Sequence, residues 1–291
     1  GFGEIPSQGL LSRFFPEIQI IGFDVVPDRR SVLLPPIHWK RFVHLCNRSR
    51  IDSRLPHRDQ VIRDALTGRG IRNAANFPSI EASVYKILAP YIDLTEKMGL
   101  LASQLLEGRV SQADITYSGL LAQQQTTQPL TMAFVKGLLT PIVQDAVNFI
   151  NAIDLARERG IKVQESKSTT EEEFVNLVSV DVVTDKGKTQ VSGTLFSNNQ
   201  PRIVKINDFY VEAIPTGYML VTHNQDKPGI IGALGTILGK NNINIAGMTF
   251  GRETPGGRAI TVINVDSPVP PNVLSELKKA QHIIDIKQIK L

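Results

Sequence analysis

The stretch HNQDKPGIIGALGTILGKNNINIAGMTFGRE, residues 223–253, carries the clearest secondary-structure pattern in the chain. Its first half predicts a helix with Pro228 in the first turn and Gly239 after its end, the usual asymmetry of helix termini. The elements predicted after residue 216 are strands at 218–222, 243–250, 259–265 and 283–289 and helices at 228–238 and 270–280. This β-α-β-β-α-β order predicts a ferredoxin-like domain over 217–291.

The block before this domain, 91–214, predicts an α+β fold. Apolar residues recur at helical spacing over 92–107, and the apolar stretch 130–150 predicts a helix broken near Pro141. From Phe174 the apolar period changes to two, which is typical of strands. The strands predicted in this block lie at 110–117, 176–183, 190–196, 203–206 and 209–214.

Residues 1–24 predict the start of a dinucleotide-binding unit. Gly1 and Gly3 match the first two glycines of the GxGxxG fingerprint, and Asp24 is an acid about 20 residues further on that would contact a ribose. Pro6 occupies the third glycine position and lacks the N–H of the other residues. On spacing alone, an ordinary turn between a strand and a helix remains the alternative.

Length and composition favour a globular protein of several domains. The 291 residues correspond to about two or three domains, and 42% hydrophobic and 21% charged residues are ordinary globular values. A single cysteine excludes an intramolecular disulfide framework and a cysteine-based zinc site. No run of 18 apolar residues predicts a membrane helix, so we expect no membrane partner and a reducing cytoplasm. The start at Gly1 suggests a fragment of a longer protein.

The basic charge is concentrated in one atypical segment, 25–60. Within 25–58 there are eight Arg or Lys and two Asp, a local net charge of +6, whereas the remainder carries −2. A nucleic-acid-binding function of this segment would give a steep salt dependence. Only Trp39 and Phe42 are present there to stack on bases, so we expect no nucleic-acid partner.

Three polar residues around the helix at 228–238 suggest a site for a small amphoteric ligand. A helix N-terminus offers N–H donors to a carboxylate, Asp226 would hold an ammonium group, and Asn224 and Asn244 would orient both. An amino acid has this set of groups. The alternative is structural, because Asp226 stands where a helix N-cap is expected.

Arg202 and Lys205 suggest an anion site. They flank the apolar pair 203–204 and would bind an anion together with Lys186 or Lys188. The alternative is a solvated strand face. No nucleophile elbow, phosphate loop or metal-ligand motif occurs in the sequence.

These motifs together resemble the long form of the D-3-phosphoglycerate dehydrogenase family. Residues 223–253 resemble its ACT domain, a ligand-sensing module of amino-acid enzymes. LLEGRVSQADITYSG (105–119) and VSGTLFSNNQPRIVKI (191–206) resemble its intervening, allosteric substrate-binding domain. VIRDALTGRGIRNAANFPSI (61–80) resembles the end of its catalytic core, so the resemblance is continuous over 61–291.

The resemblance implies an α/β and α+β multidomain protein. Its expected parts are a remnant of a Rossmann-type NAD-binding unit at 1–24, the basic segment 25–60, the end of the catalytic core and a linker at 61–90, the intervening domain at 91–214 and the ACT domain at 217–291. Pro78 and Pro90 are expected to interrupt regular structure in the linker. The basic segment is interpreted as the product of an internal deletion or a shifted reading frame.

The family's activity is NAD-dependent oxidation of 3-phosphoglycerate to 3-phosphohydroxypyruvate, the first step of L-serine biosynthesis. Its catalytic Arg, carboxylate and His lie in signatures resembling ARGG and PHLGAS, and neither string occurs here. We therefore expect this chain alone to be inactive and to retain the regulatory and assembly domains. The alternative is a serine-binding oligomerisation module that has no catalytic role.

The resemblance also assigns ligands to the candidate residues. NAD would use Gly1, Gly3 and Asp24. L-serine would bind Asn224, Asp226 and Asn244 at a seam between the ACT domains of a homo-oligomer. Arg202 matches an anion-binding position of the intervening domain, and Lys205 is included as its neighbour.

Overall fold

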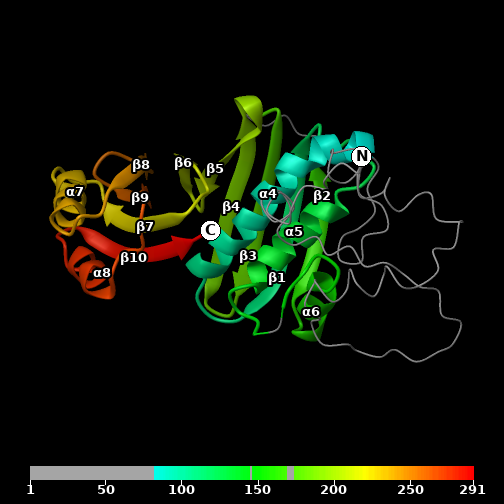
Figure 1. Ribbon diagram of the computed structural model, residues 1–291, viewed down its shortest axis with the longest axis horizontal. Helices are drawn as coiled ribbons and strands as arrows, with labels where there is room; N and C mark the ends of the chain where they lie inside the picture. The colour runs from blue at the N-terminus through cyan, green and yellow to red at the C-terminus, as the bar shows by residue number, and fades with distance from the viewer. Residues whose placement is uncertain (1–81, 145, 169–173) are drawn as a thin grey trace, which may run out of the picture. The chain divides into compact units, whose positions relative to one another are not determined.

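The computed structural model describes residues 82–144, 146–168 and 174–291. The predictions for Gly1, Gly3, Asp24 and the segment 25–60 lie outside these described residues. No helix in the described part is long and apolar enough to cross a membrane. The described chain forms two β-sheets, each with helices packed on one face (Figure 1).

The first sheet has six strands in the order β2-β1-β3-β4-β5-β6. The strands are β1 (Val110–Gly119), β2 (Lys162–Ser168), β3 (Asn176–Thr184), β4 (Gly187–Phe196), β5 (Gln200–Ile206) and β6 (Phe209–Ala213). β1 and β2 pair in parallel, whereas the other pairs are antiparallel. The period-two pattern places Val178, Val180 and Val182 in the core on one face of the sheet.

Helices α4 (Ala82–Leu105) and α5 (Gln128–Leu139) cover the apolar face of this sheet, and α6 (Ala152–Glu158) follows. The prediction that Pro90 breaks the chain is wrong, because Pro90 lies inside α4. Leu88 and Leu94 on either side of it are fully buried, so packing of the apolar stripe offsets the one missing helical hydrogen bond. The predicted break near Pro141 is confirmed, because the C-cap of α5 is Thr140, but the helix predicted to continue to residue 150 is wrong, since the described residues of 141–150 form turns and irregular structure.

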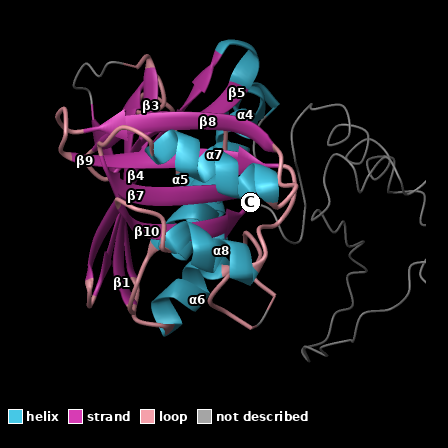
Figure 2. Ribbon diagram, turned by 90° about the vertical axis from the view of Figure 1, so that its left-hand side faces the viewer, coloured by secondary structure: helices cyan, strands magenta, loops and turns pink. Residues whose placement is uncertain are grey.

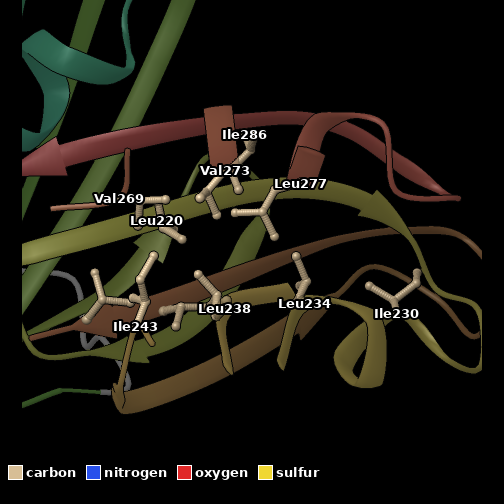
Figure 3. Packing of buried hydrophobic residues seen from close by; sticks show 11 residues of the cluster. Leu220, Ile230, Leu234, Leu238, Ile243, Val269, Val273, Leu277 and Ile286 are labelled. Carbon is tan, nitrogen blue, oxygen red and sulfur yellow. The ribbon is translucent and has the colours of Figure 1, made fainter. Parts of the chain in front are cut away.

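The second sheet has four strands in the order β10-β7-β9-β8. Its elements are β7 (Tyr218–Gln225), α7 (Ile230–Lys240), β8 (Ile245–Arg252), β9 (Arg258–Val265), α8 (Pro271–Lys278) and β10 (Ile283–Lys290). The predicted β-α-β-β-α-β order is confirmed. Figure 2 shows α7 and α8 on the same face of this sheet, where apolar residues of the helices and strands share one core (Figure 3).

The two sheets are joined within one compact part of the chain, residues 86–291. The backbone N–H of Glu212 in β6 donates to Thr249 Oγ1 of β8 at 3.2 Å. On the other side, Gln104 of α4 exchanges two 2.9 Å hydrogen bonds with the backbone of Lys290 in β10. These contacts use the helix-free face of the four-stranded sheet and the outer edge of β10.

Candidate functional site

Within one chain, the three residues predicted to bind an amphoteric ligand do not converge. Asn224 and Asp226 lie at the end of β7, and Asn244 lies directly before β8. Asn224 pairs with Ala259 of β9, whereas Ile245 pairs with Val265, six residues further along the same strand. At about 3.3 Å per residue, Asn244 is roughly 20 Å from the other two.

Asp226 is the best anchored of the three residues. Its Oδ2 accepts hydrogen bonds from Arg252 Nη1 and from the backbone N–H of Gly256, both at 3.0 Å. These two donors, the Gly256 amide first, lower the pKa of the Asp226 carboxyl group. The carboxylate therefore stays ionised at neutral pH, at the turn that connects β8 and β9.

Asp226 is not the N-cap of α7, so that alternative prediction is wrong. The cap residue is Gly229, which has a φ of 94° and no side chain to cap the helix. Gly229 is three residues further along the chain than Asp226, and its left-handed backbone turns the chain into α7 there. The carboxylate thus binds the neighbouring hairpin, and the first amide groups of α7 have no capping side chain.

Asn224 is completely buried in the sheet. Its Oδ1 accepts hydrogen bonds from Thr261 Oγ1 at 3.1 Å and Thr222 Oγ1 at 3.4 Å, and its Nδ2 donates to the backbone oxygen of Gln225 at 3.1 Å. These contacts hold the end of β7. The side chain is therefore arranged as a structural support for the residues that follow it.

Asn244 lies between Ile243 and Ile245 and has a polar partner. Its Nδ2 donates to Asp266 Oδ2 at 2.7 Å. It differs from the prediction in lying before β8 and in being exposed. The amide is thus held in place and open to solvent.

Exposed apolar side chains, which the sequence analysis did not single out, lie near Asp226. Met248 and Phe250 of β8 are 37% and 39% exposed, and Ile231 in the first turn of α7 is 43% exposed. Their register opposite Ile263 and Thr261 of β9 puts Met248 and Phe250 on the helix side of the sheet. Among the described strands, β8 pairs only with β9 and forms an edge of the sheet.

Arg202 and Lys205 lie on the same face of the first sheet because of a β-bulge. Arg202 pairs with Thr194 and Lys205 with Ser192, although residues three apart in a regular strand face opposite sides. The guanidinium of Arg202 lies 5.4 Å from the ring centroid of Phe196, and the ammonium of Lys205 lies 5.5 Å from the ring centroid of Tyr210.

Of the lysines considered as partners in the anion site, Lys188 is on this face but forms a 3.1 Å ion pair with Asp181. Lys205 pairs with Ser192 of β4, and Lys188 lies four residues before Ser192. Lys188 is therefore about 13 Å from Lys205 along β4. Lys186 lies in the turn before β4, further from Ser192 along the chain, so only Arg202 and Lys205 are neighbours.

Comparison with known proteins gives two family matches. Residues 87–207 match the D-3-phosphoglycerate dehydrogenase intervening domain, and residues 218–282 match the ACT domain. D-3-phosphoglycerate dehydrogenase of Archaeoglobus fulgidus is 41% identical over 226 residues, which cover 77% of this chain and 42% of the relative. The enzymes of Synechocystis and Bacillus subtilis are 38% and 35% identical over 80% and 77% of this chain. The chain spans less than half the length of these relatives, 42% in each case.

Proposed function

Because the chain carries the intervening and ACT domains of the D-3-phosphoglycerate dehydrogenases, we propose that it is the effector-sensing and assembly part of such an enzyme. The reaction of the whole enzyme would be NAD-dependent oxidation of 3-phosphoglycerate to 3-phosphohydroxypyruvate, which leads to L-serine. We propose the domain division 91–214 and 217–291 for the described part. The observation that supports the sensing role most strongly is the placement of Asp226 and Asn244.

These two residues would form one site only between two chains. β10 is the less favourable edge for sheet extension, because Gln104 already binds the backbone of Lys290 there. Extension through β8 by a two-fold axis would pair the strand antiparallel with its copy. The start of one strand, with Asn244, would then lie beside the end of the other, where Arg252 holds Asp226.

L-serine fits this composite site chemically. Its ammonium would bind the Asp226 carboxylate, and its carboxylate would bind the uncapped amides at the start of α7. Asn244 of the partner subunit would contact the bound serine across the seam. Asn224 would act indirectly, because its hydrogen bonds hold the end of β7 in place. Burial of Met248 and Phe250 would stabilise the dimer.

We propose that the chain alone does not catalyse the oxidation. A dehydrogenase needs a nucleotide platform and an acid–base pair that reaches the substrate. The candidate NAD contacts Gly1, Gly3 and Asp24 lie outside the described residues, and the signatures ARGG and PHLGAS do not occur in the sequence. Arg202 and Lys205 would bind an anionic group of a substrate or product in the intervening domain.

Titration calorimetry with L-serine tests the sensing role. The parent chain should bind serine, and both Asp226→Ala and Asn244→Ala should weaken binding at least about tenfold, the effect of losing a hydrogen bond to a charged group. Asp154→Ala, which removes an exposed carboxylate on α6, is the matched control and should bind as the parent does. Absence of serine binding by the parent, or unchanged binding in both variants, would contradict the proposal.

Sedimentation velocity distinguishes the composite site from a site within one chain. Dimerisation should increase with serine, and Phe250→Glu on the exposed edge strand should reduce dimerisation and serine binding together. If a monomeric variant bound serine as tightly as the parent, the seam would not be the site.

A further inference from the structure

A pocket lies where β6 meets the strands of the four-stranded sheet. It is open to solvent and has a volume of about 290 Å³. Its walls come from β6 and from three strands of the four-stranded sheet, and the lining residues are Phe209, His223, Asn224, Arg258, Ala259, Ile284 and Asp285. Asp285 is adjacent to Ile286, which packs in the helix-side core, so its side chain is directed to the other face.

A β-bulge in β10 shapes the mouth of this junction cavity. Ile283 pairs with Asn224 and Asp285 pairs with His223, so Ile284 between them has no partner in β7. Ile284 is 60% exposed although it is a large aliphatic residue. Bulges redirect side chains and occur frequently next to binding sites. Here the bulge puts an exposed aliphatic side chain beside a carboxylate at the cavity.

The polar groups of the junction cavity have opposite charges. Arg258 donates to Glu253 Oε1 at 2.7 Å, and Asp285 lies 3.6 Å from the Lys278 ammonium. Exposed ion pairs of this kind contribute about 0–1 kcal/mol each, so a ligand can replace them. A guanidinium has five N–H donors, which leaves several beyond the one that contacts Glu253.

The remaining wall is apolar or uncharged. The rings of Phe209 and His223 meet edge to face with centroids 6.2 Å apart. Burial lowers the pKa of His223, so its imidazole is neutral at pH 7. Ile284 adds an exposed aliphatic side chain to this wall.

We propose that the junction cavity binds a free α-amino acid with an aliphatic side chain. The ligand's carboxylate would pair with Arg258, its ammonium with Asp285, and its side chain would contact Phe209 and Ile284. The volume of about 290 Å³ lies at the lower limit of small-molecule pockets, about 300 Å³, which restricts the ligand to one as small as an amino acid. Asn224, which supports the end of β7 near the proposed serine site, also lines the cavity, but the proposal is argued from Arg258 and Asp285 and does not rest on serine binding.

Because Phe209 belongs to β6 and the charged residues to the other sheet, a bound ligand would connect the intervening and ACT domains. Ligand binding at such a junction restricts the relative motion of the two elements. Slower hydrogen exchange in both β6 and β10 is therefore the expected structural effect.

Titration calorimetry with L-leucine as the probe tests the inference. Leucine should bind, whereas 4-methylpentanoate and 3-methylbutylamine, which each lack one charge, should bind at least about tenfold more weakly. Arg258→Gln and Asp285→Asn should each weaken leucine binding to the same extent. These side chains are 67% and 39% exposed, so both variants should fold, which circular dichroism can verify.

Matched controls test whether the effect belongs to the charges of the cavity. Lys188→Gln and Asp154→Asn remove exposed charges elsewhere and should leave leucine binding unchanged. The inference is overturned if leucine does not bind at millimolar concentration, or if both cavity variants bind it as the parent does. It is also overturned if 4-methylpentanoate binds as tightly as leucine, because Asp285 would then have no role.

Discussion

Gly137→Ala is expected to destabilise the intervening domain by forcing α4 and α5 apart. A Cβ at residue 137 would lie 2.1 Å from the carbonyl oxygen of Glu96 and 3.0 Å from the backbone nitrogen of Leu100. Backbone atoms cannot rotate away, so the helices must separate by roughly 1 Å in a close-packed core. Overpacking costs up to about 3 kcal/mol, of which the higher helix propensity of alanine offsets about 1 kcal/mol. The expected net loss is therefore about 2 kcal/mol.

Hydrogen–deuterium exchange measured by mass spectrometry tests this expectation locally. A loss of about 2 kcal/mol corresponds to exchange about thirtyfold faster in peptides from α4 and α5. Gly239→Ala in α7 is the matched control, because a Cβ there would have no atom within 4 Å and should not accelerate exchange. If Gly137→Ala left exchange in α4 and α5 unchanged or slower, the inferred close contact between the helices would be wrong.

Three further changes test other contacts. The free energy of unfolding should fall as the pH drops below about 6.5, because burial lowers the pKa of His223 and the unfolded chain takes up the proton first. Urea unfolding at several pH values should show that the free energy of unfolding depends less steeply on pH in His223→Gln than in the parent. An equally steep dependence in both would contradict this. Tyr117→Phe removes a 2.8 Å hydrogen bond to Thr131 and should cost about 1 kcal/mol in urea unfolding, whereas a gain in stability would refute the bond's contribution. Lys287→Met removes a 2.7 Å hydrogen bond to the Leu105 carbonyl and should destabilise only the last turn of α4, by about 0.5–1 kcal/mol, which makes hydrogen exchange there about two- to fivefold faster. An effect confined to α5 would exclude this role.

Most strands could be predicted because each has one face in a core. β3 alternates buried and partly exposed residues from Val178 to Thr184, and this pattern alone specifies a strand. β2 (Lys162–Ser168) was not predicted, because none of its residues is buried and its sequence KVQESKS has no apolar alternation. It joins the sheet through backbone pairing with β1, a contact that has no sequence pattern of its own.

Local sequence rules failed where tertiary packing outweighs them. Pro90 was expected to end regular structure, but the buried residues on both sides of it keep α4 continuous. Asp226 has the sequence position of an N-cap, but its carboxylate binds Arg252 and Gly256, which are far from it in the sequence. A propensity rule includes neither the core that α4 covers nor the hairpin that approaches the end of β7.

The candidate site shows a second limit of sequence reasoning, which concerns distance. A predicted helix N-terminus drew attention to Asp226 and nearby Asn244, yet the parallel placement of β7 and β8 separates the two residues by about one strand length, roughly 20 Å. A ligand the size of an amino acid cannot contact both in one chain. In the proposed site, binding therefore requires the dimer, and ligand and subunit association must strengthen each other by the same factor. Sensing and assembly would then be one equilibrium, which explains why a single small domain with an open edge strand can serve both.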